Sequence, residues 1–227
     1  MENASKALLM AGGILIALLV LGALLLMFNQ LSDYQRSNTE LLNRSQISEF
    51  NSQFTQYARN DLQGYDLISL INKVVDYNRR TGIYGELDYN IKITLTINIT
   101  SAFQTKFGGT LNKLKVGTYT VKTRNDSLYQ MLDEFRQYDY TYTLDVMTTL
   151  VSNRQSLLDG TKSSSEFTND RQPFKDLSGN VVEGEELVRI LDDYSEYSAF
   201  KSSTFRILDE PTYTGDQVSG MSFQYLK

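Results

Sequence analysis

The sequence predicts an α+β protein in which an N-terminal transmembrane helix continues into a helical stalk and then into one head domain, built from an antiparallel sheet and packed helices. Three features of the 227-residue chain support this class: an uncharged apolar run near the start, polar sequence of helical spacing after it, and an alternating apolar segment at residues 91–100. The period of the apolar residues separates helices from strands. We expect a short tail over residues 1–6, a transmembrane helix over 7–28, a stalk over 29–49 and a head domain over 50–227.

The apolar run is the strongest of these signals. Residues 7–28 are 22 consecutive positions without a charge, an amide or a hydroxyl. As a helix they would extend about 33 Å, enough for the roughly 30 Å hydrocarbon core of a bilayer. One alternative is a buried core helix, which usually keeps a polar face. Another is a cleaved secretory signal, but the only small-residue site, Leu21-Gly22-Ala23, is followed by more apolar sequence. Lipoprotein anchoring is excluded because the chain has no cysteine.

The flanks of the run indicate orientation and partners. A short tail with Lys6 before a long apolar segment has the order of a signal anchor, so we expect a single-pass protein of the cell membrane with an extracytoplasmic C-terminal domain. Residues 7–28 should contact the lipid bilayer. Gly13 and Ala17 lie four apart, a spacing that lets a second helix approach closely. Self-association or contact with another membrane protein is therefore expected.

Two helical segments are expected after the run. There is no Pro or Gly from Asn29 to Gln63, and apolar residues recur at roughly helical spacing, so the first helix should continue out of the bilayer. A second, amphipathic helix should follow Gly64, with Asp66 in its first turn and its end at Thr81-Gly82. Its apolar face consists of Leu67, Leu70, Ile71, Val74 and Val75.

The pattern then changes to that of strands. Strict alternation over 91–100 predicts a half-buried strand whose inward residues are Ile91, Ile93, Leu95, Ile97 and Ile99. We expect a turn at Gly108-Gly109, followed by strand over 111–116 and 118–122.

A third helix is predicted from Asn125-Asp126 onward. One face of it carries Leu128, Met131, Leu132, Phe135 and Tyr138. The alternation of Tyr140, Tyr142, Leu144 and Val146 then predicts a strand.

The C-terminal part should contain a loop, a helix and a hairpin. Residues 152–180 are polar with little periodicity, which predicts a long surface loop. A helix over 183–200 should turn Leu187, Val188, Leu191 and Tyr194 inward. Strands over 204–208 and 218–225 should pair as a hairpin.

Composition excludes several classes of chemistry. The chain has no His, Cys or Trp, so imidazole bases, thiolate nucleophiles and zinc sites of His and Cys are ruled out. With 22 basic and 27 acidic residues the net charge is −5, which gives polyanions no overall attraction. We expect no enzymatic activity, no catalytic, cofactor or metal site, and no nucleic-acid partner.

A few sequence patterns partly match those of known sites. Ser198 and Lys201 fit the S-x-x-K of penicillin-recognising acyl enzymes, and 178–180 loosely fits their second element, but the order is reversed and no Lys-Thr-Gly follows. The acidic residues are expected to form a solvated helix face, because their spacing is not that of a calcium loop; they are Glu183, Glu185, Glu186, Asp192 and Asp193. The Tyr- and Thr-rich segment 138–149 suits a sheet first and a sugar-binding surface second.

The order of short tail, apolar helix, helical stalk and sheet-bearing head resembles that of type IV pilins and related pilin-like proteins. Those proteins have a leader cut before the apolar segment and usually a Glu at the fifth mature position. Counted from Gly13 or Ile14, that position is Ala17 or Leu18 here, so the processing motif is absent. The resemblance implies a surface or filament subunit.

A second resemblance covers more of the chain. Residues 3–13, the run Phe50 to Phe54 with Tyr57, the helix over 70–78 and the segment 218–223 are similar to those of uncharacterised single-span membrane proteins of Gram-positive gut bacteria. That family implies no activity.

Two functions follow as expectations. The first is a non-enzymatic, membrane-anchored cell-surface protein, such as a pilin-like or filament subunit. The alternative is an accessory component of a membrane secretion or conjugation apparatus, whose head domain binds a partner protein. An anchored hydrolase that uses carboxylates or Tyr comes third.

Overall fold

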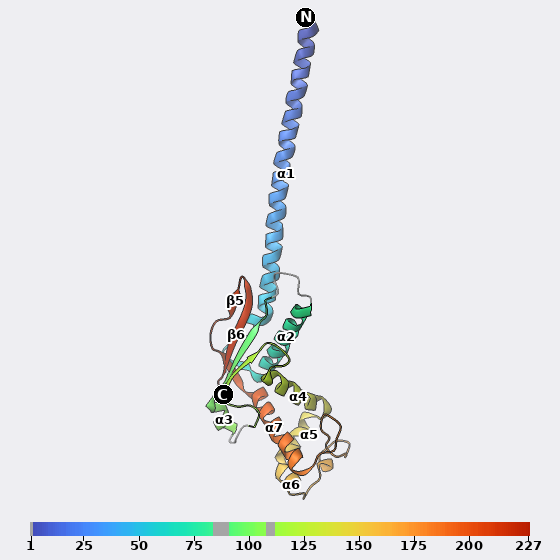
Figure 1. Ribbon diagram of the computed structural model, residues 1–227, viewed down its shortest axis with the longest axis vertical. Coiled ribbons are helices and arrows are strands. Elements are labelled where there is room, and N and C mark those ends of the chain that lie inside the picture. The colour runs from blue at the N-terminus through green and yellow to red at the C-terminus, as the bar shows by residue number, and fades with distance from the viewer. Residues whose placement is uncertain (1, 84–90, 108–111) are drawn as a thin grey trace. The chain divides into compact units, whose positions relative to one another are not determined.

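The fold is known from a computed structural model, which describes residues 2–83, 91–107 and 112–227. The chain divides into two compact units, Met1–Phe50 and Asn51–Lys227. The first is helical, and the second combines helices with a sheet (Figure 1). The predicted α+β class is confirmed.

Helix α1 (Glu2–Thr55) has 54 residues and runs without a break through the apolar run and the polar sequence after it. The expected continuation of the helix is thus confirmed. An i,i+4 pair, Glu40 with Arg44, lies along its polar part at 3.9 Å. Because both side chains are highly exposed, the pair adds little stability.

The last turn of α1 is part of the second unit. Phe54 is buried there and packs edge-on against Tyr77. The side-chain amide of Asn51 donates to Asp216 O at 2.7 Å, and its carbonyl accepts from Val218 N at 2.8 Å. These bonds join the turn to a β-hairpin far along the chain.

Helix α2 (Gly64–Ile83) follows the short strand β1 (Leu62–Gln63). The predicted amphipathic helix is confirmed, and its apolar face is buried as expected. The helix continues past Thr81-Gly82 and ends at Ile83. Gly64 is its first residue, and its N–H donates to Ser203 O at 2.7 Å.

The remaining strands are β2 (Thr94–Ile99), β3 (Gly117–Val121), β4 (Thr204–Ile207), β5 (Thr212–Thr214) and β6 (Gln217–Tyr225). The sheet order is β1-β4-β6-β2-β3, with β5 also paired to β6. The expected antiparallel sheet is wrong in one pairing, because β2 and β6 run parallel and the sheet is mixed. Parallel pairing needs a long crossover, and here most of the helices lie in the connection between the two strands.

The alternation predicted over 91–100 is confirmed, although the strand is shorter. Ile93, Leu95, Ile97 and Ile99 are fully buried, whereas Ile91 is only half-buried and precedes β2. The side chain of Asn78 caps the start of the strand: it accepts from Ile93 N and donates to Ile93 O and Lys122 O. Three hydrogen bonds explain why this amide can be buried.

The segments around β3 differ from expectation. The predicted turn at Gly108-Gly109 and residue Leu111 lie outside the described residues. Residues 112–116 do not form a strand, because the N–H groups of residues 112–114 bind the side chain of Glu196 instead of a neighbouring strand. The strand predicted over 118–122 is confirmed as β3.

Helices α3 (Ser101–Phe107) and α4 (Ser127–Thr141) come before and after β3. The predicted third helix is confirmed as α4, with its apolar face buried. The strand predicted from Tyr140 to Val146 is wrong. Those residues end α4 and begin α5 (Leu144–Ser152), where Thr143 Oγ1 accepts from Val146 N as an N-cap. Packing of α5 on a neighbouring helix overrides the alternating pattern.

The loop predicted over 152–180 contains more structure than expected. Helix α6 (Arg154–Leu158) and the 3-10 turn η1 (Ser164–Glu166) form within it. Phe174 is fully buried and stacks on Tyr142, with ring centroids 4.6 Å apart. A few buried anchors order this polar segment, which periodicity could not reveal.

The predicted helix over 183–200 is confirmed as α7 (Gly184–Ser202). It lies against α2 and α4, and its N-terminal part packs with α5 and α6 (Figure 1). Leu187, Leu191 and Tyr194 are buried as predicted, and Val188 is half-buried. The predicted pairing of the last two strands is confirmed for β4 with β6, and β5 is an additional strand between them in sequence.

Candidate functional site

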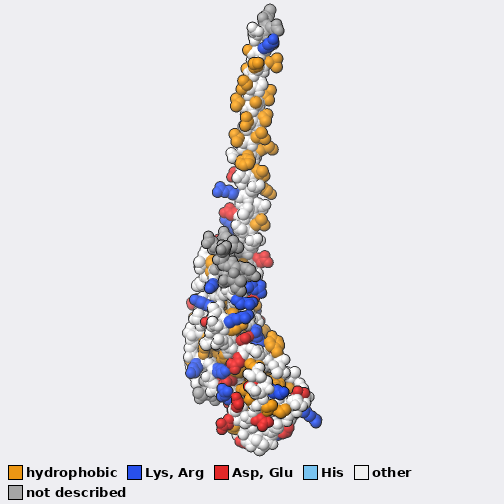
Figure 2. Space-filling view, turned by 45° about the vertical axis from the view of Figure 1, so that its right-hand side comes forward, with side chains coloured by type: hydrophobic (Ala, Val, Ile, Leu, Met, Phe, Trp, Pro, Cys, Tyr) orange, Lys and Arg blue, Asp and Glu red, His pale blue; other side chains and the backbone are white. Residues whose placement is uncertain are grey.

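The N-terminal part of α1 presents a large apolar surface. Every side chain described from Asn3 to Gln46 is exposed. Figure 2 shows apolar side chains along this part of the helix and charged side chains only near its start and after the run. In the described part of the chain, one helix is long and apolar enough to cross a membrane. Gly13 lies in open space, since an added Cβ would meet nothing within 4 Å.

The polar part of α1 carries a narrower apolar stripe. Leu31, Tyr34, Leu41 and Leu42 are exposed by 54%, 68%, 64% and 57%. At about 100° per residue these four side chains fall within an arc of about 100° on one side of the helix. Polar and charged residues occupy the rest of the circumference.

In the second unit, the carboxylate of Glu196 on α7 is the centre of a buried polar network. It accepts the backbone N–H groups of Asn112, Lys113 and Leu114; the last two bonds are 3.0 and 2.8 Å long. Glu196 is 7% exposed. Backbone donors to a carboxylate are charge-assisted bonds, so Glu196 fixes residues 112–114 to α7.

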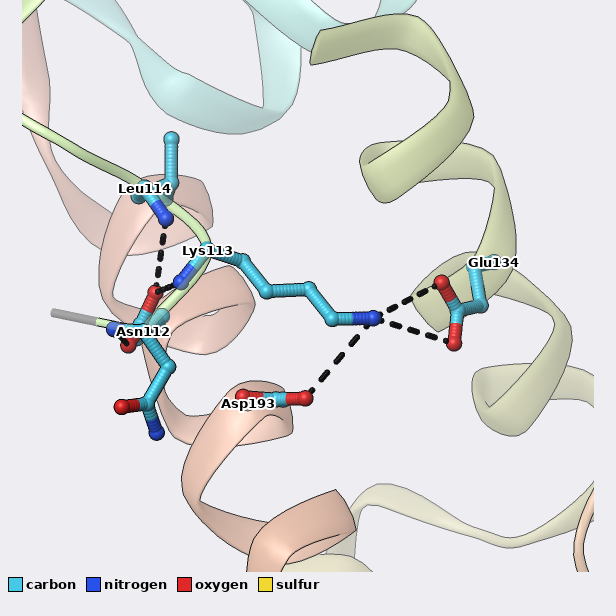
Figure 3. A network of polar contacts seen from close by, with 6 residues as sticks. Asn112, Lys113, Leu114, Glu134 and Asp193 are labelled. Atoms are coloured by element: carbon cyan, nitrogen blue, oxygen red, sulfur yellow. Dashed lines mark hydrogen bonds and ion pairs between the residues drawn. The ribbon is translucent and has the colours of Figure 1, made fainter. Parts of the chain in front are cut away.

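Lys113 continues this network toward α4. Its Nζ lies 3.1 and 3.3 Å from the carboxylate oxygens of Glu134 and 3.7 Å from Asp193 Oδ2, as the dashed lines of Figure 3 show. Burial raises the pKa of Asp193, and the ammonium of Lys113 opposes that rise. Asp193 Oδ1 has no hydrogen-bond partner within the described residues. The expectation that Asp193 lies on a solvated face is therefore wrong, and only half of its carboxylate is paired.

A second polar group, half-buried, gathers on Asp139 at the end of α4. Its carboxylate accepts from Tyr194 OH at 2.6 Å, Tyr197 OH at 3.0 Å and Lys201 Nζ at 2.8 Å. Burial, together with the charge of Asp139, raises the pKa of both tyrosines. Both phenols are therefore neutral donors at physiological pH, which makes them poor candidates for a general base.

The S-x-x-K pair, Ser198 and Lys201, lies on α7. Lys201 is bound to Asp139, while Ser198 is half-buried and lines a 230 Å³ cavity between α5 and α7. The hydroxyls of Thr148 and Ser195, in the same cavity, donate to carbonyls of their own helices. The ammonium that would activate a serine is thus committed to a carboxylate.

The other candidate residues lie elsewhere. Ser178 and Asn180 form a turn in which Asp176 accepts both backbone N–H groups, at 2.9 and 2.8 Å. Glu183, Glu185 and Glu186 are exposed at the start of α7, as expected. Asp192 is half-buried and pairs with Arg154. Among the residues with a described placement, no three potential ligands lie close enough to hold a metal ion.

Sequence reasoning missed the buried acids of α7. A signal was present, because Asp193 lies four residues before Tyr197 and Glu196 lies four residues before Phe200, on the buried side of the helix. An acid on an apolar face indicates a buried acceptor. The partner of Glu196 is a run of backbone N–H groups, which no residue type reveals.

We expect Glu196→Gln to lower the free energy of unfolding by about 2 kcal/mol. The neutral amide is a weaker acceptor than the carboxylate, and its NH2 group would face backbone N–H groups, which are donors too. Glu186→Gln, on the exposed side of the same helix, should change it by less than about 0.5 kcal/mol. Urea unfolding of the detergent-solubilised chain, followed by the near-ultraviolet circular dichroism of its tyrosines, measures both. Equal midpoints for the two variants would contradict the anchoring role of Glu196.

Comparison with known proteins gives no relative: no family model, no curated protein and no solved structure matches this chain.

Proposed function

We propose that this protein is a non-enzymatic, single-pass membrane protein of the cell surface, whose anchor is the N-terminal half of α1 and whose C-terminal unit lies outside the cell. The observation that carries the proposal is the complete exposure of an uncharged helix over residues 7–28. An apolar surface of this length needs a cover of lipid or of other helices.

Free energy supports a bilayer as that cover. On insertion scales, each Leu, Ile, Phe or Val at the centre of a spanning helix contributes about −0.3 to −0.6 kcal/mol, and a charged residue costs about 2.5 to 3.5 kcal/mol. Residues 7–28 contain many of the first kind and none of the second. The polar sequence after Phe28 supports a span that ends there.

A non-enzymatic role is supported by how the titratable groups of the second unit are used. The carboxylates of Glu196 and Asp139 accept bonds that join α7 to its neighbours. Lys113 and Lys201 are each paired with these or adjacent acids. Such groups contribute to stability and are not arranged around a cavity with a nucleophile.

Within this class we favour a subunit that assembles with its own copies, as in a pilin-like filament. The exposed stripe of Leu31, Tyr34, Leu41 and Leu42 supports this, because an isolated polar helix gains nothing from four exposed apolar side chains. An accessory component of a secretion or conjugation apparatus, with one unrelated partner, is the alternative outcome of the same experiments.

The proposal is tested by topology. With an epitope fused after Lys227, protease added to intact, wall-stripped cells should remove the epitope, because the C-terminal unit lies outside. The same epitope fused before Met1 should survive until the cells are lysed, which makes it the matched control. The chain should also resist extraction by alkaline carbonate, as integral membrane proteins do.

Survival of the C-terminal epitope on intact cells, with digestion only after lysis, would reverse the proposed orientation. Release of the chain by carbonate would overturn the membrane anchor itself.

A further inference from the structure

Three residues of the exposed stripe of α1, together with Asn38, have the spacing of a coiled-coil seam. Leu31, Tyr34, Asn38 and Leu41 follow one another at intervals of three, four and three residues. These are the first and fourth positions of a heptad, which face the partner in a coiled coil. We call these four residues the stalk seam. All of them are exposed on α1.

The same heptad frame extends back into the apolar run. Continuing the three-four spacing from Leu31 toward the N-terminus passes through Met27, Leu24, Val20, Ala17 and Gly13. The two small residues that permit a close approach in the membrane therefore lie on the same side of the helix as the stalk seam. Two copies of α1 would therefore contact each other along one continuous line, through the apolar run and the polar part of the helix.

We propose that the occupant of this seam is a second copy of the same chain, and that two copies of α1 form a parallel, in-register, two-stranded coiled coil along residues 31–49. The inference rests on the proposed membrane anchor. Two copies inserted in one membrane in the same orientation point the same way, and their apolar runs lie at the same depth. Anchoring thus selects the parallel arrangement and its register.

Charges beside the seam fit that arrangement. In a parallel pair, the residue before the first core position of a heptad lies near the residue five places later on the partner. Here those positions hold Arg44 and Glu49, which carry opposite charges. The pair occurs twice in a symmetric dimer, on the two sides of the seam.

Asn38 favours two strands. It occupies a core position, where a single Asn pairs with its counterpart across a two-stranded axis and penalises other registers and higher oligomers. In any other register the buried Asn38 amide would lose its partner. The seam can therefore specify one arrangement although it contains only three apolar residues. Its short length makes the membrane part of the line necessary for stability.

Disulfide crosslinking of the full chain in native membranes tests the proposal. The sequence has no cysteine, so one introduced cysteine can only pair with its counterpart on another copy. Tyr34→Cys and Leu41→Cys lie on the seam, and Arg36→Cys and Asn43→Cys, two residues further on, lie on the opposite side. Because a disulfide needs Cα atoms within about 7 Å, the seam variants should give at least about tenfold more covalent dimer than the controls.

Charge reversal provides a second readout in the Leu41→Cys background. Arg44→Glu should reduce the yield of covalent dimer by about fivefold, since two attractions become two repulsions. Adding Glu49→Arg should restore the yield. Glu40→Gln, which removes only the pair within one helix, should leave the yield unchanged.

Two outcomes would overturn the inference: equal crosslinking on both sides of α1, or no rescue by the double charge reversal. Carbonate extraction of the same membranes separates this failure from failure of the proposed function. A chain that stays in the membrane but does not crosslink through the seam keeps its anchor and loses the dimer. A chain that carbonate releases loses the anchor.

Discussion

Replacing Leu95 by Asp is expected to unfold the second unit, at a cost of more than about 3 kcal/mol, because the carboxylate would be buried without a partner. Leu95 is a fully buried residue of β2 and lies between Val121 of β3 and Met221 of β6. A carboxylate at this position would have a neighbouring strand on each side and would face the packed core. Urea unfolding of the detergent-solubilised chain, followed by tyrosine circular dichroism, measures the loss.

Thr96→Asp is the matched control for this variant. Thr96 is the next residue on the same strand, points to the other face of the sheet and is half-buried. Its replacement should cost about 1 kcal/mol or less, in line with the low strand propensity of Asp. If both variants tolerated urea equally well, the alternation of β2 would not separate a core face from an outer face.

Gly64→Ala is expected to be nearly as damaging, although it adds only a methyl group. A Cβ at Gly64 would lie well inside van der Waals contact with the backbone carbonyl of Phe200, and close to Lys201 O. Backbone atoms cannot rotate away as side chains do, so α2 and α7 would have to separate. The bond from Gly64 N to Ser203 O would be lost with them. We expect a loss of more than about 3 kcal/mol in the same unfolding measurement.

Gly179→Ala separates crowding from backbone strain. Gly179 has a φ of 85° but open space around its Cβ position, so its replacement should cost only about 1 to 2 kcal/mol of backbone strain. Gly64 has no such φ value. A glycine is required at this position only because the backbones of α2 and α7 lie so close together. A smaller loss for Gly64→Ala than for Gly179→Ala would contradict this account.

The elements that could be predicted from sequence are those whose burial follows a regular period. Strand β2 alternates over its whole length, and α2, α4 and α7 each carry one apolar face. The segment from Tyr140 to Val146 also alternates, yet it joins two helices. Four alternating residues fit the last turn of one helix and the first turn of the next equally well, so only the contact of α5 with α7 decides.

The candidate site was harder to predict because its contacts join distant parts of the chain. The apolar run is a local property and could be recognised directly. The bond between Glu196 and residues 112–114 crosses more than 80 positions, and its donors are backbone groups common to all residue types. The parallel pairing of β2 with β6 is equally non-local, and no turn signal specifies it.

The position of β6 also determines how late in synthesis the C-terminal unit can fold. This strand lies in the middle of the sheet, and more than half of the 227 residues separate Leu95 from its partner Met221. Such long-range pairing is slow, and it cannot begin until residues 217–225 have left the ribosome. At about 5 to 20 residues per second, the apolar part of α1 is complete about 10 to 40 s before β6 exists. If α1 is the anchor that we propose, a membrane would hold the nascent chain at its N-terminal end before the C-terminal unit folds, while the sheet is still open.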